Sequence, residues 1–191
     1  VTFTPDDNFS GVAEFTYTVS DGALVSTPAT VFVTVDPIND PTVTNPDVNS
    51  TTEDTPLVVN AANGVLSNDS DVDDSLLVDS FTVDGDLTVY SAGDTASIAG
   101  VGDLTLNGDG SYSFSPATNY NGPVPVATYT TNTGVSDSLT LSVSPENDPT
   151  VTNPDVNSTS EDTPLVVNAA NGVLSNDSDV DDSLLVDSFT V

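Results

Sequence analysis

The most informative absence in the 191-residue chain is that of basic side chains. The sequence contains no Lys, Arg or His, whereas 26 Asp and 4 Glu give it a formal net charge of −30. Nucleic acids and anionic membrane surfaces attract proteins mainly through Lys and Arg. A chain without these residues has no electrostatic source for such binding. Nucleic acid is therefore excluded as a partner, and the excess of carboxylates directs attention to cations.

The lack of His, Cys and Lys also removes most kinds of catalytic centre. Ser-His and Cys-His nucleophile pairs, Schiff bases and zinc sites of the usual His/Cys kind each need one of these residues. Only carboxylate chemistry remains, such as that of a glycosidase with two acids. The acids here lie in repeated turns and not around one cleft, so we predict that the chain is not an enzyme. Without Cys there are no disulfides, and packing or metal must stabilise the fold.

Long apolar runs are absent as well. No window approaches the roughly 20 apolar residues of a membrane-spanning helix, so direct insertion into a membrane is not expected. The first residue is Val1, and neither a basic segment nor an apolar segment of signal-peptide type follows it. We expect any secretion signal to lie elsewhere in a longer parent protein.

An internal repeat sets the organisation of the chain. Residues 39–83 recur at residues 147–191 with one change, Thr52 being replaced by Ser160, and the period is 147 − 39 = 108 residues. Weaker similarity links residues 3–22 with residues 114–134. We therefore predict three parts. These are the C-terminal part of a preceding repeat (1–38), a complete repeat (39–146) and the N-terminal part of a following repeat (147–191).

Strand signals dominate the sequence. Residues 15–19, 30–35, 112–114 and 139–143 alternate apolar and small polar side chains, the pattern of half-buried antiparallel strands. Asn107-Gly108-Asp109-Gly110 predicts a tight hairpin turn. About seven short strands in 108 residues are typical of a two-sheet sandwich. The predicted fold is therefore all-β, with tandem seven-stranded immunoglobulin-like β-sandwiches.

Two short segments join the predicted sandwiches. Residues 36–41 and 144–149 each contain two prolines, which fix φ and remove backbone donors. The segments are therefore expected to be stiff, extended linkers that place successive sandwiches in line.

The densest acidic cluster, residues 68–74, recurs at residues 176–182. Two carboxylates 4 Å apart repel by roughly 1 kcal/mol in water and by about 4 kcal/mol at an effective dielectric constant near 20, so such a cluster favours a bound cation. Calcium accepts irregular shells of six to eight oxygens, whereas magnesium needs a strict octahedron. Ca²⁺ is therefore the preferred ion.

The cluster is not an EF-hand loop, because Asp74 and Ser80 stand where that loop needs Gly and Glu. The alternative is a solvated acidic turn.

Several motifs, taken in order, resemble the bacterial cadherin-like tandem repeats of giant RTX-type surface adhesins. They are the Asn-Asp-Pro linkers at residues 39–41 and 147–149, the EDTP elements at 53–56 and 161–164, the LSNDSDVDD elements at 66–74 and 174–182, the GDGSYSFSP hairpin at 108–116 and FTYTVSDG at 15–22. The resemblance covers the whole chain. It implies cadherin-like sandwiches with calcium bound at the domain junctions, where linker residues meet a paired-Asp motif about 30 residues further along.

The resemblance also implies the ligands. At the first junction they are Asp36, Asn39, Asp40, Asp69, Asp71 and Asp73. At the second they are Asn147, Asp148, Asp177, Asp179 and Asp181, joined by Glu53 or Asp54, with Glu161 and Asp162 as the corresponding acids of the next repeat. The sequence departs from the family pattern at Asp74 and Asp182, where Gly is usual.

The expected function is that of a structural extender, in which Ca²⁺ stiffens the junctions of an extracellular adhesin or cell-surface fibre. The partners would be neighbouring identical repeats or subunits, with a surface polysaccharide as a further partner. The alternative is a carbohydrate-binding or ice-binding adhesion domain, for which Tyr90, Tyr120 and Tyr129 are candidate stacking residues. We further expect the segment 147–191 of one copy, or of one stretch of a continuous polymer, to complete the segment 1–38 of the next.

Overall fold

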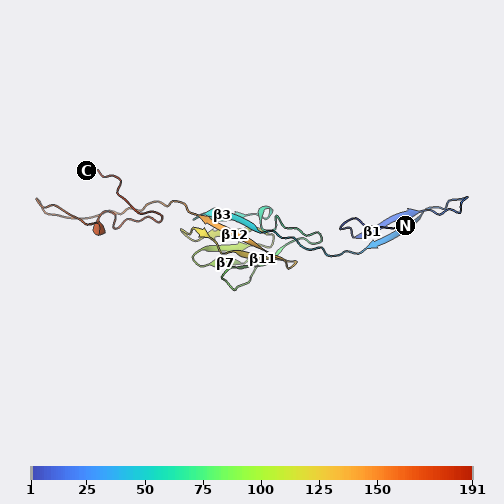
Figure 1. The fold of residues 1–191 in the computed structure, drawn as a ribbon. Coiled ribbons are helices and arrows are strands. Elements are labelled where there is room, and N and C mark those ends of the chain that lie inside the picture. The colour runs from blue at the N-terminus through green and yellow to red at the C-terminus, as the bar shows by residue number, and fades with distance from the viewer. Residues whose placement is uncertain (1, 191) are drawn as a thin grey trace.

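The computed structural model describes residues 2–190, and these form three regions along the chain. Figure 1 shows a central sandwich with a two-stranded hairpin at one end and an irregular segment at the other. We call the hairpin, made of β1 (Gly11–Tyr17) and β2 (Ala29–Val35), the head hairpin, and residues 147–190 the tail segment. No helix within residues 2–190 is long and apolar enough to cross a membrane.

The central sandwich is built from ten strands in two sheets. They are β3 (Asp47–Thr52), β4 (Leu57–Val59), β5 (Val78–Val83), β6 (Tyr90–Ser91), β7 (Thr95–Ile98), β8 (Gly102–Leu106), β9 (Tyr112–Pro116), β10 (Gly122–Pro123), β11 (Ala127–Thr131) and β12 (Ser136–Ser144). One sheet has the order β10-β12-β11-β5-β6, with β3 also paired to β12, and the other has the order β4-β9-β8-β7. Seven of the ten strands have at least four residues. The all-β sandwich expected from the sequence is confirmed.

One pairing in the sandwich is parallel. β3 runs beside β12 in the same direction, from Leu139 opposite Asp47 to Ser144 opposite Thr52. The named neighbours of β5, β8, β9 and β11 are antiparallel. The first strand of the sandwich therefore lies beside its last strand, and the two linkers leave at opposite ends of this pair, as Figure 1 shows.

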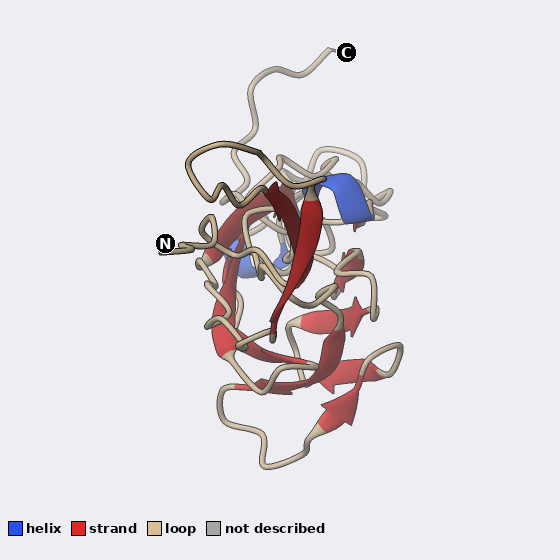
Figure 2. Cartoon of the chain, turned by 90° about the vertical axis from the view of Figure 1, so that its right-hand side faces the viewer, coloured by secondary structure: helices blue, strands red, loops and turns tan. Residues whose placement is uncertain are grey.

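Alternating side chains form the core between the two sheets. In β11 and β12, residues alternate between buried and exposed or half-buried positions, which follows from the two-residue period of a strand. Phe81, Phe114 and Tyr129 are the largest fully buried side chains. Figure 2 shows the strands as seen along the long direction of Figure 1.

Turns connect the strands largely as the sequence predicts. The turn at residues 107–110 joins β8 to β9, with Gly110 at a φ of 81° that favours glycine and its N–H donating to the Asn107 carbonyl at 3.0 Å. The segment 60–66 contains one turn of 3₁₀ helix at Ala61–Asn63. Gly64 follows this turn and packs against the backbone of Gly110.

The head hairpin contains two paired strands, whereas the tail segment contains very little regular structure. β1 and β2 pair antiparallel over seven residue pairs, from Gly11 opposite Val35 to Tyr17 opposite Ala29. The tail segment forms no strand within residues 147–190, although residues 155–159 and 186–190 have the same sequence as parts of β3 and β5. Its regular features are one turn of 3₁₀ helix at Ala169–Asn171 and a bridge between Val151 and Ser178. The division of the chain at residues 38 and 146 stays a prediction.

Candidate metal centre

The acidic loop of the complete repeat folds back onto the linker that precedes it. The backbone N–H of Asp40 donates to Asp73 Oδ2 at 2.6 Å, and the Thr42 hydroxyl donates to Asp71 Oδ2 at 2.6 Å. The bridge between Val43 and Ser70 holds the two segments together. The linker residues Asp40 and Thr42 therefore contact Asp73 and Asp71, which lie about 30 residues further along the chain.

Asp71 organises the turn of this loop. Its Oδ1 accepts hydrogen bonds from the N–H groups of Asp73 and Asp74, both at 2.9 Å. The hydrogen bond from Thr42, followed by those from these two N–H groups, lowers the pKa of the Asp71 carboxyl group. Asp71 is therefore held as a carboxylate, the form that a cation requires.

Asp69 is turned toward the sandwich. Its Oδ1 accepts from the backbone N–H of Asn45 at 2.8 Å, and its Oδ2 accepts from the buried Tyr129 hydroxyl at 2.8 Å. Burial of the Tyr129 hydroxyl and its hydrogen bond to Asp69 raise the pKa of the tyrosine. Asp69 thus anchors the acidic loop to the core. Sequence reasoning missed this role of Tyr129, which it named only as a candidate stacking residue.

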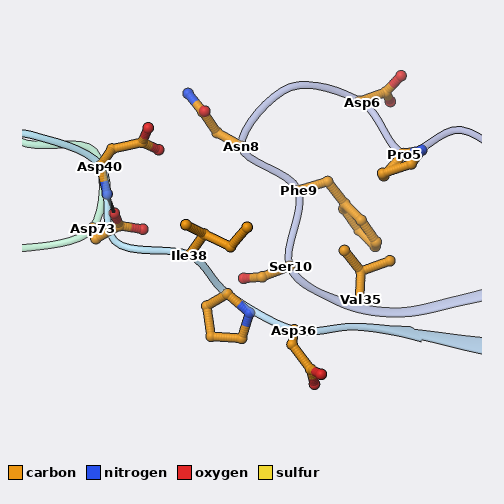
Figure 3. A pocket seen from close by; sticks show the side chains of 11 residues that line it. Pro5, Asp6, Asn8, Phe9, Ser10, Val35, Asp36, Ile38, Asp40 and Asp73 are labelled. Carbon is orange, nitrogen blue, oxygen red and sulfur yellow. Dashed lines mark hydrogen bonds between the residues drawn. The ribbon is translucent and has the colours of Figure 1, made fainter.

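The first junction also includes a pocket between the head hairpin and the sandwich, shown in Figure 3. Asp36, Asp40 and Asp73 line it, but the Asp36 side chain points away from Asp40 and Asp73. Asn39 donates from its side-chain nitrogen to the Asp40 carbonyl at 3.0 Å. The structure therefore brings Asp40 and Asp73 together at this junction and leaves the Asp36 carboxylate apart from them.

The second junction repeats the loop geometry. The N–H of Asp148 donates to Asp181 Oδ2 at 2.7 Å, and the Thr150 hydroxyl donates to Asp179 Oδ2 at 2.6 Å. Asp177 Oδ1 accepts from the N–H of Asn153 at 2.7 Å. The Asn147 side-chain nitrogen donates to the Asp148 carbonyl at 3.1 Å. Near-identical sequences thus form the same linker-to-loop contacts twice.

Acids of the preceding sandwich join this second junction. Glu53 is only 3% exposed, and its Oε1 accepts from the Glu146 N–H at 2.6 Å. Asp54 Oδ1 accepts from the Asn119 N–H at 3.1 Å. The side-chain amide of Asn119, oriented with its nitrogen toward both carboxylates, bridges Asp54 Oδ2 and Asp148 Oδ2 at 3.3 Å each. Glu53 and Asp54 therefore flank the linker at Asp148. Their role as ligands of a shared ion stays a prediction.

Electrostatics at Asp148 reflect this gathering of acids. Burial raises the pKa of its carboxyl group, and the carboxylates of Asp181, Asp54, Glu53 and Asp179 raise it further, in that order. A divalent cation placed among these groups would reverse the repulsion between them. Carboxylates and amide oxygens are the hard ligands that calcium prefers, so the donor set fits this ion.

The acids do not already form a closed coordination shell. Within the part of the chain that the structure describes, no three or more acidic side chains stand close enough together to hold a metal ion. Backbone N–H groups and hydroxyls donate to both carboxylate oxygens of Asp71 and Asp179 and to Oδ2 of Asp73 and Asp181. Glu161 and Asp162, predicted for a further junction, are exposed. Metal binding would therefore require a rearrangement of the carboxylates.

Some partners of these acids carried no distinctive sequence signal. Thr42 and Thr150 each lie 29 residues before the Asp that they contact, and Asn119 and Asn121 contact Asp54 and Glu53. Thr and Asn are common throughout the chain, so composition does not single them out. The repeated spacing of 29 residues could have indicated the two threonines.

Comparison with known families agrees with this geometry. Residues 39–145 match the bacterial cadherin-like domain, and residues 1–36 match a cadherin-like domain. No curated protein matches the chain. The first match covers more than half of the sequence and coincides with the sandwich and its preceding linker. The chain therefore belongs to the family of bacterial cadherin-like domains.

Proposed function

We propose that the chain is an extender repeat of a calcium-rigidified extracellular adhesin or cell-surface fibre. Bacterial cadherin-like domains are typical of secreted or surface proteins, are typically non-catalytic and often bind calcium. These family properties support a structural role in adhesion. The RTX-type adhesin and the biofilm setting belong to this proposal.

One observation carries the proposal: the carboxylate of Asp148 in the linker is close enough to Glu53 and Asp54 of the sandwich, and to Asp179 and Asp181 of the following segment, for all four to raise its pKa. Acids from both sides of one linker can become ligands of the same ion. Without a cation their like charges repel and the linker is free to bend. With Ca²⁺ the same groups attract one centre, and motion between the neighbouring units is restricted. Extracellular calcium sites typically bind at about 10⁻⁴–10⁻³ M, so the stiffening would operate outside the cell.

The alternative, a carbohydrate-binding or ice-binding domain, receives less support from the aromatic residues. Tyr129 is fully buried, and Tyr90 stacks on Phe81 with ring centroids 5.2 Å apart. The Tyr120 hydroxyl donates to the Pro123 carbonyl at 2.5 Å. The candidate stacking residues are thus engaged within the sandwich.

Calorimetric titration of the 191-residue chain with Ca²⁺ and with Mg²⁺, together with X-ray scattering, tests the proposal. We expect Ca²⁺ to bind at about 0.1–1 mM, more tightly than Mg²⁺, and to increase the maximum dimension of the molecule. Asp148→Asn should weaken calcium binding at the second junction by about 10-fold or more. The matched control is Asp103→Asn, which removes one exposed charge from β8 and should leave binding unchanged.

Two results would reject the extender function. One is the absence of calcium binding and of any change in length at millimolar Ca²⁺. The other is equal calcium affinity of the unmodified chain and the Asp148→Asn variant, with the Asp103→Asn variant behaving in the same way.

A further inference from the structure

The loop between β9 and β10 reaches the second junction through Asn119. The backbone of Asn119 has a φ of 57°, in the left-handed region that Asn tolerates better than most residues. Its N–H donates to Asp54 Oδ1 at 3.1 Å, and the Tyr120 N–H closes the turn by donating to the Ala117 carbonyl at 3.0 Å. This conformation places the side-chain amide between a carboxylate of the sandwich and a carboxylate of the linker.

The amide of Asn119 lies at the same distance from both carboxylates. With its nitrogen turned toward them, Asp54 Oδ2 and Asp148 Oδ2 are each 3.3 Å away. A primary amide has two N–H donors at one end and an oxygen at the other, and the two ends have nearly the same size. A half-turn about χ2 therefore exchanges the donors for an oxygen without moving the loop. The chain contains no Lys, Arg or His, so no basic side chain can take this place.

The first junction has an Asn at the equivalent position. The similarity of residues 3–11 to residues 114–122 aligns Asn8 with Asn119, and the linkers align Asp40 with Asp148. Asn8 has a φ of 59°, again in the left-handed region. Asn8 and Asp40 both line the pocket between the head hairpin and the sandwich (Figure 3). An Asn in this backbone conformation thus shares each junction with the linker Asp.

Glu53 differs from Asp54 in what holds its carboxylate. Glu53 is 3% exposed, and its two oxygens accept hydrogen bonds from the Glu146 N–H at 2.6 Å and from the Asn121 side-chain nitrogen at 3.3 Å. These contacts fix the start of the linker. Of the two acids, Asp54 is the one whose Oδ2 contacts the Asn119 amide.

We propose that Asn119 is a turning amide that serves the second junction both without and with its ion, an inference that rests on the proposed function. Without an ion, its two N–H groups donate to Asp54 and Asp148 and offset part of the repulsion between them. With Ca²⁺, the amide turns and its oxygen joins the two carboxylates as a neutral ligand, since calcium accepts Asn oxygens. Asp54, and not Glu53, is then the acid of the sandwich that shares the ion with Asp148.

The number of ligands and the strength of the contacts agree with two such states. Within residues 2–190, no three acidic side chains stand close enough together to hold a metal ion, so a neutral oxygen is needed beside the carboxylates. Contacts of 3.3 Å from the Asn119 nitrogen are at the long end for N–H···O hydrogen bonds. The ion-free linker therefore keeps a preferred direction and still bends.

Limited digestion of the 191-residue chain with a Glu-specific protease tests the ion-free state. Cleavage after Glu146 reports opening of the linker, and cleavage after the exposed Glu161 is the internal reference. In calcium-free buffer, Asn119→Asp should raise the rate of cleavage after Glu146 about 10-fold, because a third carboxylate replaces the two donors. Asn119→Gly removes the donors without adding charge and should raise the rate less. The matched control Asn60→Asp, at an exposed residue before the 3₁₀ turn, should leave the rate unchanged.

Calorimetric titration with Ca²⁺ tests the ion-bound state. Asn119→Asp keeps an oxygen at this position and adds a charge, so it should bind calcium at the second junction about 3-fold or more tightly than the unmodified chain. Asn119→Gly lacks the oxygen and should bind it about 10-fold more weakly. Asp and Gly both tolerate a φ near 57° and keep the backbone N–H, so a merely structural role would affect the two variants alike.

Two results would overturn the inference. One is equal weakening of calcium binding by Asn119→Asp and Asn119→Gly. The other is cleavage after Glu146 that is no faster in Asn119→Asp than in Asn60→Asp. Absence of calcium binding by the unmodified chain would instead reject the proposed function and the ligand role with it, and the cleavage rates in calcium-free buffer would still decide the role of the N–H groups.

Discussion

Single residues of this chain occur as twins with the same sequence neighbours and different surroundings. Phe81 and Phe189 are 1% and 84% exposed, and Val65 and Val173 are 0% and 54% exposed. Glu53 is buried against the linker, whereas Glu161 is exposed. Local sequence alone therefore does not determine burial here. The partner strands do, and each pair of twins offers a matched internal control.

Asp47 gives a pH-dependent prediction at the residue scale. Its Oδ2 is buried without a hydrogen-bond partner. Burial, followed by repulsion from Asp69 and Asp137, raises the pKa of Asp47 from 3.8 to about 6. Because the folded state binds a proton at Asp47 more tightly than the unfolded state does, protonation of this group stabilises the fold. The stabilisation is fully present below the unfolded-state pKa of 3.8 and is lost as the pH rises through about 6.

Stability in calcium-free buffer should therefore increase as the pH falls from 7 to 5. At pH 7, Asp47→Asn should raise the free energy of unfolding by about 1 kcal/mol, after allowance for the partial exposure of the group. In the Asp47→Asn variant, the increase in the free energy of unfolding on lowering the pH from 7 to 5 should be much smaller than in the unmodified chain. Urea denaturation followed by Tyr fluorescence measures both effects. Asp103→Asn serves as the control, because its free energy of unfolding should still increase as the pH falls from 7 to 5. A variant less stable than the unmodified chain at pH 7 would contradict this account.

At the scale of elements, the turn at residues 60–66 packs closely against the β8–β9 hairpin turn. A Cβ atom added to Gly64 would stand 2.1 Å from the Gly110 carbonyl oxygen, and the Val65 N–H donates to the same oxygen at 2.9 Å. Gly172 has the same sequence neighbours, but its nearest contact from an added Cβ is the Asn168 oxygen at 3.3 Å. The close approach therefore comes from the hairpin and not from the turn itself.

Gly64→Ala is expected to lower the free energy of unfolding of the sandwich by about 1–3 kcal/mol, because backbone must move to admit the methyl group. Gly172→Ala should change it by less than about 0.5 kcal/mol. Urea denaturation at low protein concentration measures both variants. Equal destabilisation by the two substitutions would show that the loss arises within the turn.

The same elements show what the sequence could predict. Alternation identified β2, β9 and β12, and the Asn-Gly-Asp-Gly turn located a hairpin, because these signals are local. The parallel strand β3 escaped notice because Asp47–Thr52 contains one apolar residue, Val48, and that side chain is 81% exposed. Its place is determined by pairing with β12. The contact of Asp40 with Asp73 followed from family spacing, whereas the bridging role of Asn119 depends on the fold and had no local signal.

For the whole molecule, the one-sided charge predicts an unusual response to salt. The chain has a net charge of −30 and no Lys, Arg or His. Added salt therefore screens the repulsion between its carboxylates, and there are no ion pairs between side chains for the salt to weaken. Raising KCl from about 10 to about 200 mM shortens the Debye length from about 30 to about 7 Å. We expect the melting temperature of the sandwich in calcium-free buffer to rise by several degrees, an effect of about 1 kcal/mol.

Calorimetry across this salt range provides the measurement. A variant with Asp79→Asn and Asp103→Asn, which neutralises two exposed acids on strands of the sandwich, should have a smaller dependence on KCl. A melting temperature that falls with KCl would mean that attractive charge interactions dominate, contrary to the composition of the chain.

The parallel pairing of β3 with β12 has a mechanical consequence. One linker enters before β3 and the other leaves after β12, so tension along the chain pulls these two neighbouring strands in opposite directions. Six residue pairs join them, from Leu139 with Asp47 to Ser144 with Thr52. The load is then a shear across the whole ladder, in which the hydrogen bonds resist together and do not open one after another from an end. A string of such units would stretch little until this seam yields.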